Sequence, residues 1–475
     1  IAVIGDGSMT AGMAFEALNH AGDLHKNLIV ILNDNEMSIS PNVGAMSSFL
    51  SRKLNSGTMR NLKDHLEEGL KSMSSVGENI LSLLRKSEES LKAFFTPGML
   101  FEALKFKYIG PIPGHDLEDL IETLRNVRDN KQRGPVLIHV LTTKGKGYIP
   151  AEMNPGDYHG LGPFSIATGR SLPSLGPVSY TEVFGQTICS LAEQDKRVCA
   201  ITAAMPAGTG LTEFSQRFPD RFFDVGIAEQ HAVTFAAGLA LDGLRPVVAV
   251  YSSFMQRSLD QLIHDVCLPD LPVTFALDRA GVVGDDGPTH HGVFDISFLR
   301  FVPNLTVMAP KDENELRRML YTSVNSDSPC AVRYPRGGGE GITLDQEVEE
   351  LSIGQGELLR EGRDLLLLPV GNRVYPALEA AEGLAKLGID AAVINPRFIK
   401  PLDNELISDW ARTCGRVLTV EDNVKKGGFG GAVLQMLHEM HLLVPCRILG
   451  YGNKFIDQAS QQILWKNAGI KPFKY

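Results

Sequence analysis

Hydrophobic and polar positions alternate along the chain in blocks that predict strands followed by amphipathic helices. The first block predicts a strand at Ile1–Ile4, a helix at about Thr10–Ala21 and a strand at Leu28–Leu32, which is the pattern of a βαβ unit. A further apolar run at Pro135–Leu141 predicts another strand. Residues 57–105 switch to helical periodicity, which predicts either helices packed over the sheet or a mobile insertion at about residues 50–110.

The same alternation of strands and helices recurs twice more along the chain. Two stretches separate the blocks: residues 150–178, rich in proline and glycine, and Gly337–Gly339 with the acidic run that follows it. Strands are predicted at Val198–Thr202, Pro246–Tyr251, Val273–Leu277, Leu305–Met308 and Ala331–Tyr334, then at Leu365–Val370, Ala391–Ile394 and Arg416–Val420. This order predicts an α/β fold of three doubly wound, mainly parallel-sheet domains at residues 1–165, 177–340 and 352–475.

The chain begins directly in its first predicted strand, Ile1–Ile4, without a lead-in segment. A parallel strand needs cover on both faces and pairing at its sides. We therefore expect the first domain to be truncated.

Composition narrows the class of function. The 43% hydrophobic and 21% charged residues are typical of a globular protein, and no apolar run reaches the length of a membrane span. A net charge of −10 without a basic stretch argues against nucleic acid as a partner. The six cysteines are scattered without a Cys-x-x-Cys pair, which indicates reduced thiols in a cytosol-like compartment and gives no support for a zinc site.

The first candidate site follows the first predicted strand. In Gly5-Asp6-Gly7 a turn precedes a helix, so backbone amides and the helix N-terminus can face a phosphate while Asp6 supplies a hard oxygen ligand. Alone, such a motif is more often a plain turn. Asn35, however, ends Asn33-Asp34-Asn35 at the matching end of the next strand, and with the Met37 carbonyl and diphosphate oxygens it would complete an octahedral Mg²⁺ site.

The second block carries polar residues at several strand ends. Glu229 opens an apolar helix, where it is either a partner of the helix dipole or a buried carboxyl that exchanges a proton with a heterocycle nitrogen. Tyr251 and Arg257 flank an aromatic segment that either belongs to the core or stacks on a ring and meets a phosphate. Two further loops carry Asp278-Arg279 and Asp286-Gly-Pro-Thr-His290-His291, at strand ends where α/β sites gather.

Two other motifs leave alternatives open. Arg333 and Arg336 are each either a fork for a phosphate or part of a surface ion pair. Gly427-Gly-Phe-Gly-Gly431 either binds an anion or forms a helix-opening loop or a subunit contact.

Taken together, these motifs resemble the thiamine-diphosphate-dependent enzymes of the transketolase superfamily. The likeness runs through the whole chain, and it is strongest to the 1-deoxy-D-xylulose-5-phosphate synthase family. The motifs that carry this narrower resemblance are Ala228-Glu-Gln-His231, Tyr251-Ser-Ser-Phe-Met-Gln-Arg257, Asp278-Arg-Ala-Gly281, Asp286-Gly-Pro-Thr-His290 and Arg333-Tyr-Pro-Arg-Gly337.

The resemblance implies an activity and its cofactors. Members of that family use thiamine diphosphate and Mg²⁺ to condense pyruvate, with loss of CO₂, and D-glyceraldehyde 3-phosphate. The product, 1-deoxy-D-xylulose 5-phosphate, begins the non-mevalonate isoprenoid pathway and feeds thiamine and pyridoxal synthesis. A homodimer in the bacterial cytoplasm, or in the plastid stroma of a plant or alga, is expected by the same likeness, with neither nucleic acid nor membrane as a partner.

The resemblance also implies residue roles. Glu229 would bond the cofactor's pyrimidine N1′, and Phe254 would stack on the pyrimidine with Arg257 nearby. The metal ligands would be Asp6, Asn35 and Met37, within a cofactor-binding set that includes Gly5, Gly7 and Ser8. The acceptor phosphate would be bound by Tyr251, Arg279 and Arg336, and substrate hydrogen bonding and proton transfer would involve Asp286, His290 and His159.

Two departures from the family pattern keep other functions open. His159 is followed by Gly-Pro-Phe-Ser-Ile, where Lys-Phe-Asp-Pro is usual, and about half a domain that family members carry before Gly5 does not precede it here. The alternatives are a transketolase-like ketol transferase and a truncated paralogue with impaired catalysis.

Overall fold

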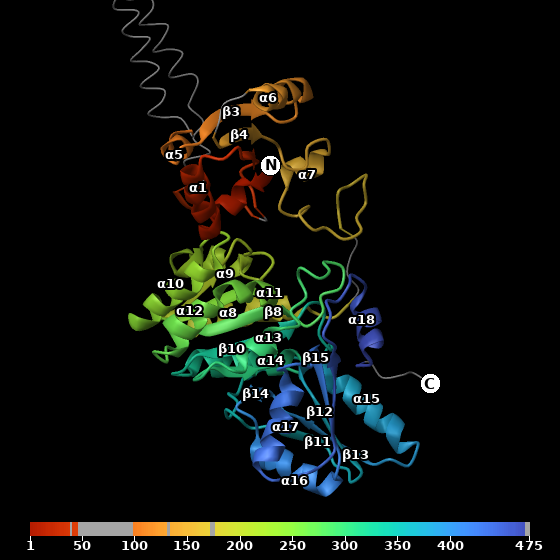
Figure 1. The fold of residues 1–475 in the computed structure, drawn as a ribbon. Coiled ribbons are helices and arrows are strands. Elements are labelled where there is room, and N and C mark those ends of the chain that lie inside the picture. Colours follow the sequence, from red (N-terminus) through yellow and green to blue (C-terminus); the bar gives the residue numbers. More distant parts are fainter. Residues whose placement is uncertain (39, 46–97, 131–133, 172–175, 471–475) are drawn as a thin grey trace, which may run out of the picture. The chain divides into compact units, whose positions relative to one another are not determined.

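Three β-sheets, each with helices against it, make up the computed structural model, which describes residues 1–38, 40–45, 98–130, 134–171 and 176–470 (Figure 1). The chain divides into two compact units. One comprises Ile1–Pro173 with Gly226–Ala228, and the other comprises Ser174–Val225 with Glu229–Tyr475. The mainly parallel α/β fold predicted from the sequence is confirmed.

The first unit is built on a four-stranded, fully parallel sheet in the order β1-β2-β4-β3. Its strands are β1 (Ala2–Gly5), β2 (Ile29–Asp34), β3 (Lys107–Pro113) and β4 (Val136–Leu141). The helical elements are the 3₁₀ turn η1 (Asp6–Thr10), α1 (Gly12–Leu24), α5 (Met99–Ala103), α6 (Leu117–Asp129) and α7 (Ile149–Met153). Leu18, Leu32, Phe101 and Leu137 form the centre of its core.

Strand β3 was missed from the sequence. It contains Pro111 and Pro113, which cannot donate to a sheet, and it accordingly lies at an edge. The helical periodicity at residues 57–105 falls largely outside the described residues. At its end lies α5.

The second unit contains a seven-stranded sheet in the order β14-β9-β10-β8-β7-β5-β6. Its strands are β5 (Val198–Thr202), β6 (Phe222–Asp224), β7 (Arg245–Tyr251), β8 (Thr274–Ala280), β9 (Thr306–Met308), β10 (Cys330–Pro335) and β14 (Phe398–Lys400). Its principal helices are α8 (Tyr180–Gln194), α9 (Thr212–Arg217), α10 (Glu229–Leu241), α11 (Ser252–Met255), α13 (Asp295–Leu299) and α14 (Glu313–Asn325). All neighbouring strands are parallel except β14, which runs antiparallel to β9.

The third sheet has the order β11-β13-β12-β15-β16 and is parallel apart from β11. Its strands are β11 (Glu357–Arg360), β12 (Leu365–Pro369), β13 (Ala391–Asn395), β15 (Val417–Val424) and β16 (Cys446–Tyr451). The helices are α15 (Val374–Ala385), α16 (Asn404–Cys414), α17 (Phe429–Glu439) and α18 (Gln461–Ala468).

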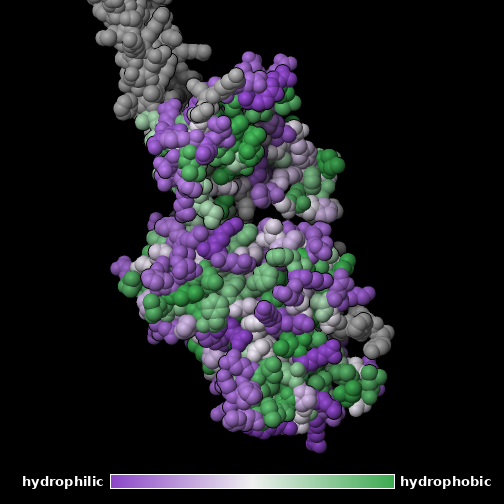
Figure 2. Space-filling model, in the orientation of Figure 1, coloured by the Kyte–Doolittle hydropathy of each residue, from purple (hydrophilic) through white to green (hydrophobic). Residues whose placement is uncertain are grey.

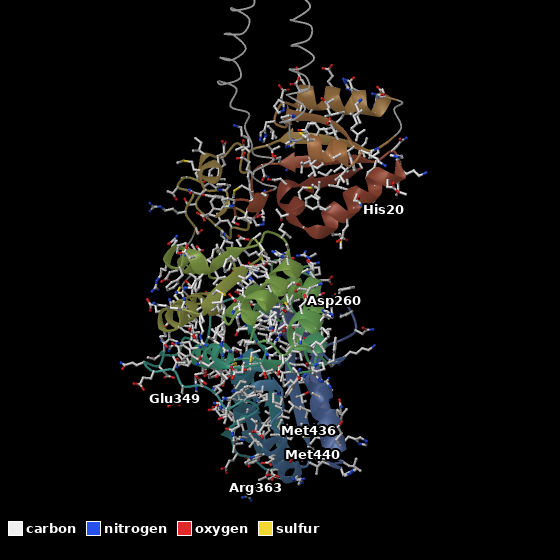
Figure 3. All side chains as sticks on the ribbon, turned by 90° about the vertical axis from the view of Figure 1, so that its left-hand side faces the viewer. His20, Asp260, Glu349, Arg363, Met436 and Met440 are labelled. Carbon is white, nitrogen blue, oxygen red and sulfur yellow. The ribbon has the colours of Figure 1, made fainter. Side chains whose placement is uncertain are left out.

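The second and third sheets share one hydrophobic cluster within the second unit. Val307 of β9, Leu366 of β12 and Ile394 of β13 all belong to it. Met436 of α17 is also a member, and Met440, which follows that helix, packs against the cluster (Figure 3). This common core explains why the two sheets form one compact unit.

The outer surface mixes polar and apolar residues, as is usual for globular proteins (Figure 2). Among the described residues, no helix combines the length and the apolar character that spanning a membrane requires.

Candidate functional site

The first polar site lies where β1 and β2 end. The two strands are parallel and Gly5 pairs with Asn33, so Asp6 and Asn35 come to the same edge of the sheet. Asp6 Oδ1 accepts a hydrogen bond from the Asn35 N–H at 3.4 Å, and Asn35 Oδ1 accepts one from the Met37 N–H at 3.1 Å. The structure therefore brings Asp6, Asn35 and Met37 together, as expected from the sequence.

Close packing surrounds the turn that carries Asp6. At Gly7 a Cβ would lie 2.7 Å from the Ser38 Cβ, so only glycine fits there, whereas the Cβ position of Gly5 is open. Ser8 is half-buried in η1. The sequence analysis missed Asn42, whose Nδ2 donates to Asp6 Oδ2 at 2.6 Å.

Two buried carboxyl groups lie side by side in this site. Burial, together with the charge of Asp34, raises the pKa of Asp6 to about 6. Burial also acts to raise the pKa of Asp34, but hydrogen bonds from His139 and the Glu36 N–H outweigh it and lower that pKa. The His139 Nε2 lies 2.8 Å from Asp34 Oδ2. His139 was missed because it is a single polar residue within an apolar run.

His159 lies beside Lys144, which follows β4. The Lys144 Nζ is 3.0 Å from His159 Nδ1 and donates to the Ser38 carbonyl at 2.5 Å. Burial lowers the pKa of Lys144, against the opposing charge of Asp6. His159 is thus connected through Lys144 to the loop that packs against Gly7.

The donor atoms of the first site suit a hard cation. Within the described ranges, no cluster of three or more His, Cys, Asp or Glu side chains could hold a metal ion by itself. One carboxylate, one amide oxygen and one backbone carbonyl are the oxygen donors from which Mg²⁺ sites are built, and Mg²⁺ takes its remaining ligands from phosphate and water.

In the second unit, Glu229 is a buried carboxylate with an unused hydrogen-bonding capacity. It opens α10 and is 2% exposed. Its Oε1 accepts from Arg257 Nη1 at 2.5 Å, whereas Oε2 is buried without a hydrogen-bond partner. Because buried polar atoms are nearly always paired, this oxygen fits a donor or a protonated nitrogen of a bound ligand.

Aromatic and basic side chains gather next to Glu229. Phe254 stacks on Tyr251 with ring centroids 5.4 Å apart, and its edge contact with His290 has a centroid distance of 5.3 Å. The Arg257 guanidinium lies 4.9 Å from the Phe254 ring centre. The structure therefore brings together four side chains that the sequence placed on two different strand ends.

Arg279 is held in a fixed position at the end of β8. Its guanidinium lies 4.2 Å from the Tyr251 ring centre, and Nη1 bonds Asp278 Oδ2 at 2.9 Å and Thr181 Oγ1 at 3.2 Å. Burial raises the pKa of Asp278, and the Arg279 charge opposes this effect. Sequence reasoning assigned no role to Asp278, although it precedes the predicted arginine directly.

Arg336 and Asp286 form an ion pair at 2.9 Å, and Arg336 also donates to the Val283 carbonyl at 3.0 Å. Burial raises the pKa of the Tyr251 hydroxyl; the charge of Asp286 adds to this effect and that of Arg336 opposes it. His291 differs from its neighbour His290: it is buried, its Nδ1 accepts from the Val283 N–H at 3.0 Å, and burial lowers its pKa. His291 therefore supports the loop as a neutral side chain.

The chain matches profiles of known families along most of its length. Residues 1–142 match the family described as 1-deoxy-D-xylulose-5-phosphate synthase, residues 176–340 the transketolase pyrimidine-binding domain, and residues 354–474 the transketolase C-terminal domain. A 1-deoxy-D-xylulose-5-phosphate synthase of Desulfotalea psychrophila is 67% identical over 99% of this chain and 73% of its own length. The chain belongs to the 1-deoxy-D-xylulose-5-phosphate synthase family.

Other relatives agree with this membership. 1-Deoxy-D-xylulose-5-phosphate synthase 1 of Geobacter sulfurreducens is 59% identical over 99% of this chain and 74% of that relative. Members of the 1-deoxy-D-xylulose-5-phosphate synthase family are thiamine-diphosphate-dependent, transketolase-like enzymes, so the predicted class of enzyme is confirmed.

Solved structures show the same fold. A split-gene transketolase, described as an inactive β4 tetramer, is 29% identical with a TM-score of 0.57, covering 62% of this chain and 94% of that one. A transketolase of Campylobacter jejuni covers 99% of this chain and 75% of its own, with 18% identity and a TM-score of 0.52.

Proposed function

We propose that the chain condenses pyruvate, with loss of CO₂, and D-glyceraldehyde 3-phosphate to 1-deoxy-D-xylulose 5-phosphate. Family membership supports this reaction, and the single structural observation that carries it is Glu229. Its buried Oε2 lacks a partner next to an aromatic side chain and an arginine, which suits the aminopyrimidine end of thiamine diphosphate.

The residues of the second unit have separate tasks in this proposal. When bound, thiamine diphosphate supplies a nucleophilic carbon and an electron sink. Glu229 would hold and exchange a proton at the pyrimidine N1′, and Phe254 would stack on that ring, while Arg257 keeps Glu229 oriented. Because Arg257 occupies only Oε1, the other oxygen stays available to the cofactor.

The substrates are bound by the charged groups around Tyr251. Tyr251, Arg279 and Arg336 bind the acceptor phosphate, for which a guanidinium is the best-matched donor. Asp286 and His290 hydrogen-bond the substrates and transfer protons, and His159 of the first unit has a similar role.

Asp6, Asn35 and the Met37 carbonyl would hold Mg²⁺ in the first unit. Gly5, Gly7 and Ser8 would lie along the diphosphate, because they belong to the turn that begins at the same edge of the sheet as Asp6 and Asn35. A magnesium ion would also offset the repulsion between Asp6 and Asp34.

We also propose that the active form is a homodimer. The relatives named above are bacterial, which supports a cytoplasmic rather than a plastid location. The reaction would then begin isoprenoid synthesis and feed thiamine and pyridoxal synthesis.

The test measures CO₂ release from pyruvate and formation of 1-deoxy-D-xylulose 5-phosphate, with thiamine diphosphate, Mg²⁺ and glyceraldehyde 3-phosphate. We expect turnover by the wild type and a fall in kcat of about 100-fold or more in Glu229→Gln, since proton transfer is worth that much. Glu213→Gln removes an exposed carboxylate that pairs with Arg217, and it should keep the wild-type rate.

Three results would overturn the proposal in different ways. Consumption of a ketose phosphate donor without CO₂ release from pyruvate would indicate a ketol transferase. Calorimetric binding of cofactor without turnover would indicate an impaired paralogue. A wild-type rate in Glu229→Gln would remove Glu229 from the mechanism.

A further inference from the structure

A row of three polar side chains, two of them buried and one half-buried, crosses the neighbouring strands β2, β4 and β3 of the first unit. His139 in β4 is 1% exposed, and its Nε2 lies 2.8 Å from Oδ2 of Asp34, the last residue of β2. Its Nδ1 lies 2.7 Å from the hydroxyl of Tyr108 in β3. The proposed reaction assigns no role to any of these three residues.

The hydrogen bonds in this row have one consistent direction. The Asp34 carboxylate can only accept, so His139 Nε2–H donates the hydrogen bond that joins them. In the neutral ring that carries its proton on Nε2, Nδ1 is an acceptor, and the Tyr108 hydroxyl therefore donates to it.

Asp34 also forms hydrogen bonds that hold the turn after β2. Its other oxygen, Oδ1, accepts from the Glu36 N–H at 3.1 Å, and its backbone carbonyl accepts from the Thr142 N–H at 2.8 Å. The same turn directs the Asn35 N–H toward Asp6 and carries the Met37 carbonyl. One oxygen of the Asp34 carboxylate is thus bound by His139, and the other binds the Glu36 N–H of the turn.

We propose that His139 is a positioning residue for the metal and diphosphate end of the cofactor, acting through Asp34 on the Asn35–Met37 turn. For the identity of the ligand, this role rests on the proposed function. Groups that orient metal ligands without touching the metal commonly change metal affinity by about 10–100-fold when they are replaced. A His–Asp pair that served stability alone would leave the turn and the affinity unchanged.

The experiment compares four variants of the full chain. His139→Leu removes the donor to Asp34, His139→Gln returns an amide N–H near the position of Nε2, and Tyr108→Phe removes only the hydroxyl. Leu137→Ala is the matched control, because Leu137 is fully buried two residues earlier in β4 and makes apolar contacts. Hydrogen exchange at residues 33–38 is measured without ligand, and calorimetry gives the affinities for Mg²⁺ and thiamine diphosphate.

We expect the Glu36 amide to exchange about tenfold faster in His139→Leu, and its Mg²⁺ affinity to fall by about 10–100-fold. His139→Gln should restore most of the slow exchange and most of the Mg²⁺ affinity. Leu137→Ala should lower the melting temperature and leave the exchange rate and the Mg²⁺ affinity unchanged. Tyr108→Phe should also speed exchange of the Glu36 amide and weaken Mg²⁺ binding. This variant provides the test if His139→Leu does not fold.

The positioning role would be overturned if the amides of residues 33–38 exchanged at the same rate in His139→Leu as in Leu137→Ala. If His139→Leu does not fold, equal exchange rates in Tyr108→Phe and the wild type would overturn it. Failure of the wild type to bind Mg²⁺ or thiamine diphosphate would instead contradict the proposed function. In that case the exchange comparison still decides whether His139 orders the turn.

Discussion

Glu421 shows how strongly burial alone can change the chemistry of one residue. It is fully buried in β15, and its two carboxylate oxygens accept from the N–H groups of Phe429 and Gly430 at the start of α17. Burial raises its pKa to about 7, although these two bonds and the charge of Arg333 act in the opposite direction. The motif Gly427-Gly-Phe-Gly-Gly431 thus opens a helix, one of the three alternatives that its sequence left open.

This raised pKa predicts a stability that depends on pH. The folded state binds the proton more tightly than the unfolded state, so Glu421 contributes stability that is complete below its unfolded pKa and is lost as pH rises through about 7. We expect the wild type to lose about 2 kcal/mol of unfolding free energy between about pH 5.5 and pH 8.5 relative to Glu421→Gln. Denaturant unfolding at both pH values measures this difference.

Glu439→Gln is the matched control for this prediction, because Glu439 lies exposed at the other end of α17. Its pH dependence should follow the wild type. A Glu421→Gln variant with the same pH dependence as the wild type would show that Glu421 is ionised throughout the range.

At the scale of elements, the loop after β8 is held in place by a strand of the third sheet. Asp422 of β15 accepts from the Val282 N–H at 3.3 Å and the Tyr451 hydroxyl at 2.7 Å, and its other oxygen accepts from Trp465 Nε1 at 3.0 Å. Gly281 has a φ of +75°, and a Cβ there would overlap the Asp422 carboxylate. The third sheet thereby fixes the loop that begins at Gly281, two residues after Arg279.

We predict that Asp422→Ala raises the KM for glyceraldehyde 3-phosphate about tenfold, and by more than the KM for pyruvate. The freed loop no longer fixes Arg279, and the loss of bonds to a buried charge costs about 1–3 kcal/mol of stability. Steady-state kinetics with each substrate varied in turn provides the measurement. Tyr451→Phe, which removes one of the three bonds, should lie between this variant and the wild type, and equal increases in both KM values would contradict the argument.

The sequence predicted the long, apolar strands well and the short or edge strands poorly. β5 has the predicted bounds, and β7 and β12 differ from prediction by one residue at one end. β14 was missed, because three residues carry little periodicity and its partner β9 lies about ninety residues earlier. Its antiparallel pairing places a segment of the third predicted domain in the second sheet.

The candidate sites divide in the same way. Residues at strand ends were predicted because carboxyl ends of parallel strands collect functional groups, and the structure groups Asp6 with Asn35 and Tyr251 with Phe254. The supporting groups were missed, since His139 and Asp34 meet only through the pairing of β2 with β4. Such pairing cannot be inferred from spacing along the chain.

For the whole molecule, the sequence predicted three domains, whereas the structure divides into two compact units. The linker-like residues around Gly337–Gly339 predicted a boundary between a second and a third domain. In the structure, residues on both sides of that stretch share one core and several buried polar bonds, including those of Asp422. Composition is insensitive to this kind of packing, because a short polar connection is compatible with separate and with joined domains.

The reactivity of the six cysteine thiols tests the packing of the second unit, because these thiols lie in its core and near its surface. All six cysteines are described and free; five are buried, and Cys446 is partly exposed. Burial raises the pKa of every one, to about 12 for Cys199 and Cys267, so little reactive thiolate forms near neutral pH. A thiol-reactive disulfide reagent should therefore modify at most one thiol of the native chain quickly, and all six only after denaturation.

Cys446→Ser should remove the fast phase and leave the total reduced by one, and activity should not change when a reductant is added. Several fast thiols in the native chain would mean that the core of the second unit opens readily. A gain of activity on reduction would mean that a disulfide forms where the structure shows free thiols. Either result would contradict the conclusion that these cysteines act as buried packing groups rather than as redox-active ones.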